Sequence, residues 1–135
     1  MTGVQTCALP ISELLDNVDI LVVNEHEGAF LARGGDVASL APIVIVTLGA
    51  AGAVAHEGGQ EVRIPAPKVS AVDATGAGDT FCGALAALLA EGAPLGAAVR
   101  FAVAAASLSV QKPGAVPSIP ARAEIDAAHN EAAQW

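Results

Sequence analysis

The chain has 135 residues, a length that suits one domain, and its formal net charge is -8 at pH 7. Hydrophobic residues make up 53% of the sequence, which excludes an intrinsically disordered protein. No basic run is present, so we expect no nucleic-acid partner. A chain this acidic has to bind an anion through backbone N–H groups, helix N-termini or metal ions.

The sequence carries no signal for secretion or membrane insertion. Its longest apolar stretches, Thr80–Ala90 and Phe101–Val110, fall short of the ~20 residues that a membrane span needs. The two cysteines, Cys7 and Cys82, match neither a disulfide framework nor a zinc site, and we expect Cys82 to be buried. The expected location is therefore the cytoplasm, with no membrane partner.

The first residues, Met1–Ser12, show neither helical nor strand periodicity. Their sequence, MTGVQTCALPIS, resembles translated sequencing-adapter fragments. We therefore expect residues 1–12 to be a non-native leader and residues 13–135 to be the C-terminal part of a larger domain.

The first half of the chain alternates apolar strands with short helical segments. Asp19–Val23 is an apolar, β-branched run that predicts a buried strand. Asn24–Arg33 predicts a helix, because Glu25 and Glu27 in its first turn suit the helix dipole. The next expected elements are a helical turn at Asp36–Leu40, a strand at Pro42–Leu48, a turn at Gly49–Gly52 and a hairpin formed by Ala53–His56 and Gln60–Ile64.

The second half predicts a brief strand at Val69–Val72 and then mainly helices. A Gly-rich turn leads into an apolar helix at roughly Ala77–Ala90. The remaining expected elements are a helix at Pro94–Val110 that is apolar all round, a loop at Gln111–Pro120 and an amphipathic helix at Ala121–Gln134. Strands that alternate with helices predict an α/β sheet, at least partly parallel, with ligands beyond the carboxyl ends of its strands.

The segment from Asp73 to Asp79, DATGAGD, is the strongest chemical signal. Gly76 and Gly78 let the backbone approach a ligand, and they precede a helix whose first N–H groups have no partner. Such a helix start binds anions, and Asp79 places a carboxylate beside it that can accept the proton of an attacking hydroxyl. The alternative is an ordinary helix cap after a glycine turn. The dinucleotide, Walker A and nucleophile-elbow patterns are absent.

The longer segment VDATGAGDTFCGAL closely resembles the C-terminal signature of the PfkB-type carbohydrate kinases, the ribokinase family. Three further matches follow in that family's order: Asn24–Glu27 resembles its N-x-x-E motif, Thr47–Gly52 its nucleotide-phosphate loop and Lys112–Pro120 the segment after its penultimate helix. The resemblance implies a three-layer ribokinase-like (Rossmann-like) α/β sheet with flanking helices, of which this chain would hold an incomplete C-terminal half.

The resemblance also implies ATP-dependent phosphorylation of a sugar hydroxyl, with ribose as the first candidate. Asp79 would be the general base and contact the sugar, and Gly76, Ala77 and Gly78 would form the anion hole. The residues implied to contact ATP are Asn24, Thr47, Leu48, Gly49, Ala50, Ala51, Gly52 and Gly78. Glu27 would organise Mg²⁺ through water. The residues implied to surround an activating K⁺, largely by backbone oxygens, are Asp73, Thr75, Ser109, Lys112, Gly114 and Ser118.

Two readings of the chain's own activity stay open. Family members are longer, and the half that carries their sugar-binding residues has no counterpart here, so we expect the isolated chain to be inactive. The helix at Pro94–Val110 would then leave apolar surface exposed. The alternative is a non-catalytic nucleotide-binding remnant, and the substrate could also be another sugar or a nucleoside. The full-length parent is a candidate homodimer.

Overall fold

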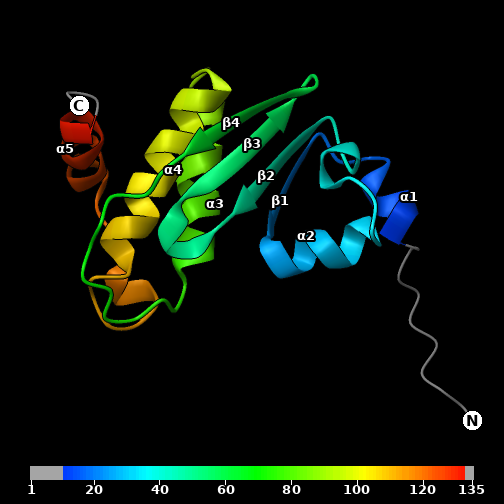
Figure 1. Cartoon of the computed structure of the whole chain (residues 1–135). Coiled ribbons are helices and arrows are strands. Elements are labelled where there is room, and N and C mark those ends of the chain that lie inside the picture. Colours follow the sequence, from blue (N-terminus) through cyan, green and yellow to red (C-terminus); the bar gives the residue numbers. More distant parts are fainter. Residues whose placement is uncertain (1–10, 133–135) are drawn as a thin grey trace, which may run out of the picture.

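The computed structural model describes residues 11–132, which form one four-stranded sheet with helices packed against it (Figure 1). The helices and strands are α1 (Ile11–Leu15), β1 (Ile20–Asn24), α2 (Glu25–Ala32), β2 (Ile43–Thr47), β3 (Ala53–Glu57), β4 (Gln60–Ile64), α3 (Ala77–Ala90), α4 (Leu95–Ser109) and α5 (Arg122–Ala132). Short 3-10 helices are η1 (Val37–Ser39), η2 (Gly49–Ala51) and η3 (Val116–Ser118).

The strands lie in the order β1-β2-β3-β4. β1 and β2 are parallel, with Ile20 opposite Ile43 and Asn24 opposite Thr47, and α2 lies in the crossover that a parallel pair requires. β2, β3 and β4 are antiparallel to their neighbours, and Gly58 and Gly59 form the tight turn between β3 and β4. The expected α/β sheet, at least partly parallel, is therefore confirmed.

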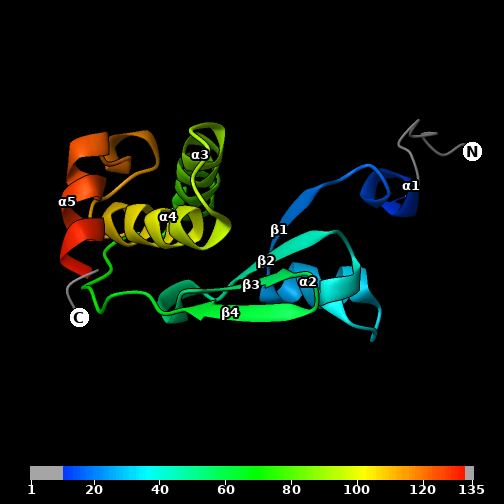
Figure 2. The same cartoon turned by 90° about the horizontal axis from the view of Figure 1, so that it is seen from above.

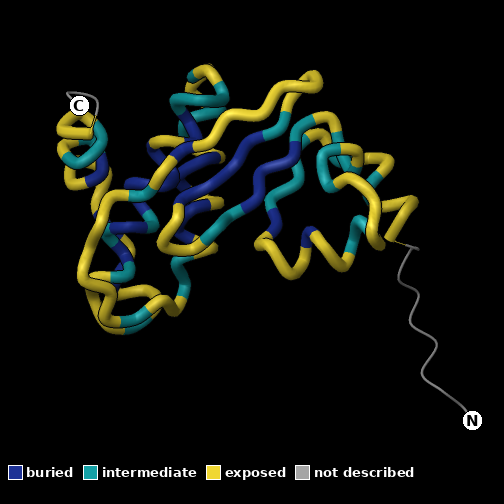
Figure 3. The backbone as a smooth tube through the Cα atoms, in the orientation of Figure 1, coloured by how far each residue is buried: buried dark blue, intermediate teal, exposed yellow. Residues whose placement is uncertain are grey.

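Apolar side chains on both faces of the sheet hold the layers together. On one face, Ile45 packs into the larger core with residues of α3 and α4, such as Phe81 and Val99. On the other face, Val44 and Val46 form a smaller core with partly buried residues of α2 and η1. Figure 2 shows α3 and α4 on one side of the sheet, and Figure 3 shows buried residues running through β2, β3 and α4.

The expected strand at Val69–Val72 is wrong, because these residues form no strand. Their chain runs beside the end of α4, where the N–H groups of Val72 and Asp73 donate to the carbonyl oxygen of Val110 at 2.7 and 3.1 Å. The last carbonyl groups of a helix have no partner within the helix. They therefore accept hydrogen bonds from this segment, whose N–H groups are then not available to a neighbouring strand.

The expected burial of Cys82 is also wrong: this cysteine is exposed on α3, because the buried face of that helix is formed by Phe81, Ala84 and Leu85. The expectation of exposed apolar surface on α4 fails too, since most residues of this helix are buried against α3 and the sheet. Large exposed apolar side chains lie elsewhere, with Phe30 81% exposed on α2 and Val116 78% exposed in η3.

Several sequence expectations fall on residues outside the described range. Most of the leader at 1–12, with Cys7, lies there, as does the end of the last expected helix beyond Ala132. Within residues 11–132, no helix combines the length and the apolar character needed to cross a membrane.

We predict that Gly52 cannot be replaced. Its φ is +100°, and a Cβ atom there would lie 2.0 Å from the carbonyl oxygen of Ile64. Gly52→Ala should therefore lower the free energy of unfolding by about 3 kcal/mol, measured by urea denaturation. Gly58 is the matched control, because its φ is also positive (+57°) but no atom lies within 4 Å of the added Cβ. Equal losses in the two variants would contradict this role for Gly52.

Candidate active site

The last residues of β1 and β2, Asn24 and Thr47, lie side by side at the carboxyl edge of the sheet. The register pairs them directly, and the hydroxyl of Thr47 donates to the carbonyl oxygen of Val23 at 3.4 Å. Each residue is followed by a helical segment, α2 after Asn24 and η2 shortly after Thr47. Parallel strands of α/β proteins present ligand sites at this edge.

Asn24 and Glu27 form a reciprocal cap at the start of α2. The side-chain oxygen Oδ1 of Asn24 accepts from the N–H of Glu27 at 2.8 Å, and the N–H of Asn24 donates to Oε2 of Glu27 at 3.0 Å. This capping box explains both residues structurally. It leaves Nδ2 of Asn24 and Oε1 of Glu27 without a hydrogen-bond partner among residues 11–132.

The loop after β2 presents backbone donors. Within it, the N–H of Leu48 donates to Gly52 at 2.8 Å, and the N–H groups of Ala51 and Gly52 donate to Leu48 and Gly49 at 3.1 Å each. The N–H groups of Gly49 and Ala50 find no acceptor in the described part of the chain. Two adjacent free amides suit an anionic oxygen.

The start of α3 presents a second set of donors. Gly76 is its N-cap, with a φ of +78°, and a Cβ atom there would lie 3.2 Å from Cβ of Ala115. The N–H of Ala77 donates to Ala74 at 3.2 Å. The amides of Gly76, Gly78 and Asp79 have no acceptor among the described residues. Of the three expected anion-hole donors, Ala77 is thus already bonded.

The N–H of Asp79 is a donor that the sequence reasoning missed. The signal was available, because the first amides of any helix lack partners within it. The carboxylate of Asp79 is exposed, makes no hydrogen bond or ion pair with a described residue, and lies on the rim of a groove of about 530 Å³. The groove runs between α3, α5 and the loop before α5. A free carboxylate beside free amides can accept a proton from a bound hydroxyl.

Cys82 lies in the first turns of α3, three residues after Asp79. Partial burial raises the pKa of this thiol, and the carboxylates of Asp79 and Glu27 raise it further.

Asp73 ties the turn before α3 to the loop after α4. Its Oδ1 accepts from the N–H and the hydroxyl of Thr75 at 2.9 and 2.6 Å, and its Oδ2 accepts from the N–H of Gly114 at 2.8 Å. The Thr75 hydroxyl first, and then the amides of Gly114 and Thr75, lower the pKa of Asp73. Asp73 therefore does more than cap its own turn.

The other residues expected around a cation are held by local contacts. Ser109 and Ser118 are buried, and their hydroxyls donate to the carbonyl oxygens of Ala106 and Ala115 at 2.8 and 2.7 Å. The ammonium group of Lys112 pairs with Glu124 at 3.3 Å, so this side chain reaches toward α5. The carbonyl oxygens of Thr75, Lys112 and Gly114 accept no hydrogen bond from a described residue.

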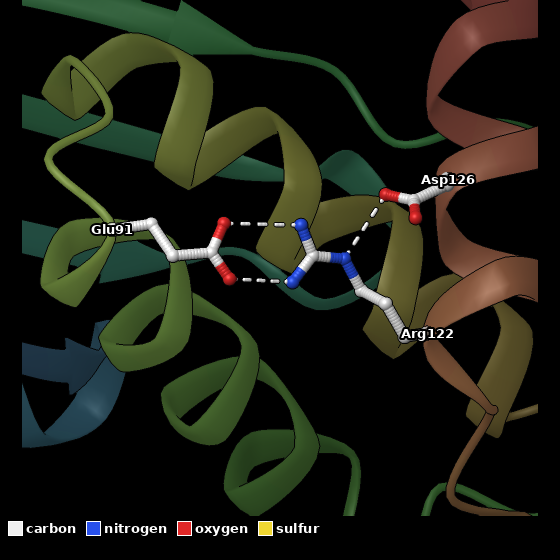
Figure 4. Close-up of polar contacts among 3 residues, drawn as sticks. All are labelled: Glu91, Arg122 and Asp126. Carbon is white, nitrogen blue, oxygen red and sulfur yellow. Dashed lines mark hydrogen bonds and ion pairs between the residues drawn. The ribbon is translucent and has the colours of Figure 1, made fainter.

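An ion-pair cluster fixes α5 against α3 (Figure 4). Two nitrogens of Arg122 donate to the Glu91 carboxylate at 2.7 and 3.1 Å, and its Nε donates to Asp126 at 3.1 Å. The guanidinium also lies 4.9 Å from the ring centroid of Phe101. Hydrogen bonding to Arg122 lowers the pKa of Glu91. No sequence pattern predicted this cluster.

We predict a pH-dependent contribution of Asp73 to stability. The pKa of Asp73 is lower in the folded state than its ordinary value of 3.8. The ionised carboxylate therefore stabilises the fold at pH values above 3.8, and this contribution is lost as the pH falls through the folded pKa. Asp73→Asn should therefore lower the melting temperature at pH 7, and the deficit should shrink steadily as the pH falls below 3.8. Glu57→Gln, which changes an exposed carboxylate on β3 that bonds to no described residue, is the control. A pH-independent deficit would contradict the prediction.

Comparisons with known proteins agree with this geometry. The family model described as pfkB family carbohydrate kinase matches residues 3–122. Ribokinase of Lactococcus lactis is 41% identical over 119 residues, which are 85% of this chain and 40% of that protein.

Two solved structures extend the comparison. Ribokinase of Arabidopsis thaliana, complexed with ribose and ATP, superposes with a TM-score of 0.80 at 36% identity, over 87% of this chain and 43% of that one. Phosphofructokinase-2 of Escherichia coli, in complex with potassium, gives a TM-score of 0.80 at 25% identity, over 91% and 44%.

The chain spans about two fifths of the length of the curated relatives that it matches. Over that length the expected ribokinase-like α/β fold is confirmed, with its sheet and flanking helices. The family match covers most of the chain, and the motifs that match lie at the strand ends and helix starts described above. This chain belongs to the pfkB family of carbohydrate kinases.

Proposed function

We propose that the protein containing this chain transfers the γ-phosphoryl group of ATP to a sugar hydroxyl, and that ribose is converted to ribose 5-phosphate. The observation that carries the proposal is the free carboxylate of Asp79 beside the unpartnered amides of Gly76 and Gly78. The family match supports a kinase, and the Lactococcus lactis and Arabidopsis thaliana relatives support ribose as the substrate. Because the chain spans less than half of these relatives, the activity is proposed for the whole protein.

Asp79 is the proposed general base. Its carboxylate accepts the proton of the sugar hydroxyl while the hydroxyl oxygen forms a bond to the γ-phosphorus, and the bond from that phosphorus to the β-phosphate oxygen breaks to release ADP. The free amides of Gly76, Gly78 and Asp79 donate to the oxygens of the transferring group. Donors fixed before the reaction stabilise this charge without reorganising.

The loop after β2 is the proposed site of the ATP phosphates. The free amides of Gly49 and Ala50 face no competing acceptor among the described residues, and Nδ2 of Asn24 is free at the adjacent strand end. Thr47 lies beside Asn24 and adds its hydroxyl. The rest of the expected set, Leu48, Ala51 and Gly52, shapes this loop through its internal hydrogen bonds.

Glu27 fits the role expected for it toward Mg²⁺. Within residues 11–132 no group of three or more acidic, histidine or cysteine side chains could hold a metal ion, so a dedicated cage is absent there. Mg²⁺ usually keeps several waters and takes one or two carboxylates with the phosphates, and Glu27 retains one free oxygen for such a contact. When bound, the ion would neutralise part of the phosphate charge.

The segments joined by Asp73 fit a monovalent cation. The free carbonyl oxygens of Thr75, Lys112 and Gly114, with the Asp73 carboxylate, form a donor set of oxygens only, which suits K⁺. Buried Ser109 and Ser118 would complete the set. The related phosphofructokinase-2 structure contains potassium. Asp73 itself holds the turn before α3 through its hydrogen bonds. A bound K⁺ would add positive charge beside this turn and stabilise it further.

We predict that Asp79→Asn lowers kcat for ribose by about 10²–10⁴-fold, the usual contribution of a general base. The measurement uses this chain joined to the unmatched part of Lactococcus lactis ribokinase, so that the enzyme is complete. ATP binding, measured by calorimetry, should not change, and Glu57→Gln should match the unaltered protein. Full turnover in Asp79→Asn would place the base elsewhere.

We also predict that K⁺ activates the same completed enzyme. Rates measured in K⁺ should exceed those in Na⁺ or tetramethylammonium at constant ionic strength. Na⁺ is smaller and more strongly hydrated than K⁺, and tetramethylammonium is too bulky to enter a cage of carbonyls. The change should appear in kcat or nucleotide affinity, and Asp73→Ala should abolish it. Equal rates in all three cations would remove the cation site from the proposal.

A further inference from the structure

β4 lies at the outer edge of the sheet, on the side of the hairpin, and no described strand lies beyond it (Figure 2). Its residues from Gln60 to Arg63 are exposed, and Val62 is 47% exposed. Charged side chains on an edge strand discourage pairing with most other strands. In β4, however, a glutamate and an arginine flank an exposed valine, and this order is complementary to itself when the strand is reversed.

The turn between β3 and β4 decides which backbone groups of β4 are free. Both of its glycines have a positive φ, +57° and +78°, as in a two-residue type I′ turn. In such a turn the flanking residues, Glu57 and Gln60, bond to each other, and the register pairs them directly. Because facing alternates along an antiparallel strand, the N–H and C=O groups of Glu61 and Arg63 point to the open edge.

A second copy of β4, related by a two-fold axis at Val62, fits this edge. Glu61 of each copy then lies opposite Arg63 of the other copy, and the two Val62 side chains meet at the axis. Since Glu61 and Arg63 both face the edge, each opposite pair exchanges backbone hydrogen bonds, as an antiparallel ladder requires. A two-fold axis at Glu61 or at Arg63 would instead place like charges opposite each other, which destabilises a strand pair.

The charged groups of this edge have only distant partners within one chain. The Glu61 carboxylate lies 3.7 Å from the nearest nitrogen of Arg63 and 3.9 Å from Nδ1 of His56. Both distances exceed that of a hydrogen bond, and the side chains of Glu61 and Arg63 are 53% and 65% exposed. Residues directly opposite in a strand pair are closer than residues two apart on one strand, about 5 Å against about 7 Å. Pairing therefore brings a nearer guanidinium to each carboxylate.

We propose that the β4 edge, formed by Glu61, Val62 and Arg63, pairs with the same edge of a second copy of this chain and joins two sheets into one. Pro65 follows β4 and has no N–H group, so the pairing is short. Interfaces that bury less than about 1,200 Å² are usually transient, and we therefore expect a reversible dimer. The inference does not rest on the proposed phosphoryl transfer.

Sedimentation velocity of the 135-residue chain over a range of concentrations measures this dimer. Glu61→Arg makes the edge wholly positive, and Arg63→Glu makes it wholly negative. Each variant alone should dimerise about tenfold more weakly than the unaltered chain, because two attractive pairs become repulsive. An equimolar mixture of the two variants should form a heterodimer as tightly as the unaltered chain dimerises, because every reversed charge then lies opposite its complement.

Two matched controls separate charge order from charge content. The double variant with both Glu61→Arg and Arg63→Glu keeps the composition and net charge of the chain and should dimerise normally. Glu131→Arg makes the same change of net charge as Glu61→Arg, but on the exposed surface of α5, and should also dimerise normally. Melting curves of each variant establish that it folds.

Hydrogen exchange of the unaltered chain gives a second measure that needs no variant. Exchange at the Glu61 and Arg63 amides should slow as the concentration rises, whereas the Val62 amide, already bonded to β3, should change little. A monomer at all concentrations would overturn the proposal. So would a dimer that neither single reversal weakens, a mixture of the single variants that stays monomeric, or equal exchange at Glu61 and Arg63 at low and high concentration.

Discussion

The carboxylate of Asp73 joins the two segments on which the rest of the site depends. It bonds to Thr75 within its own turn and to Gly114, which is 41 residues away in the sequence. The loop so held places Ala115 against Gly76, where only a glycine with positive φ gives the chain room to start α3. The free amides at this start therefore have one orientation, as an electrostatic site needs.

The net charge of -8 explains why backbone groups provide these donors. Arg122, which lines the same groove as Asp79, and Lys112 serve the fold, since Arg122 binds Glu91 and Lys112 binds Glu124. The first pair holds the far end of α3 to α5, and the second holds the loop after α4 to α5. Neither pair leaves a cationic group for the start of α3, and the anion site there consists of N–H groups alone.

Patterns within short stretches predicted most of the fold and the site. β-branched runs marked β1 and β2, Gly58–Gly59 marked the hairpin of β3 and β4, and glycines marked the turn before α3, whose observed bounds are Ala77–Ala90. The errors arose where distant segments decide the outcome. Val69–Val72 has a strand-like sequence, but the carbonyl oxygen of Val110 takes its backbone donors. The Glu91–Arg122 pair joins residues 31 positions apart, and neither residue carries a local signal.

The two edges of the sheet differ in the side chains that they present. β4 ends the sheet with charged side chains, whereas β1 leaves an apolar edge that ends at Asn24. Asn24 is also the residue that pairs with Thr47, so the apolar edge of β1 ends at the carboxyl edge of the sheet, where the candidate site lies.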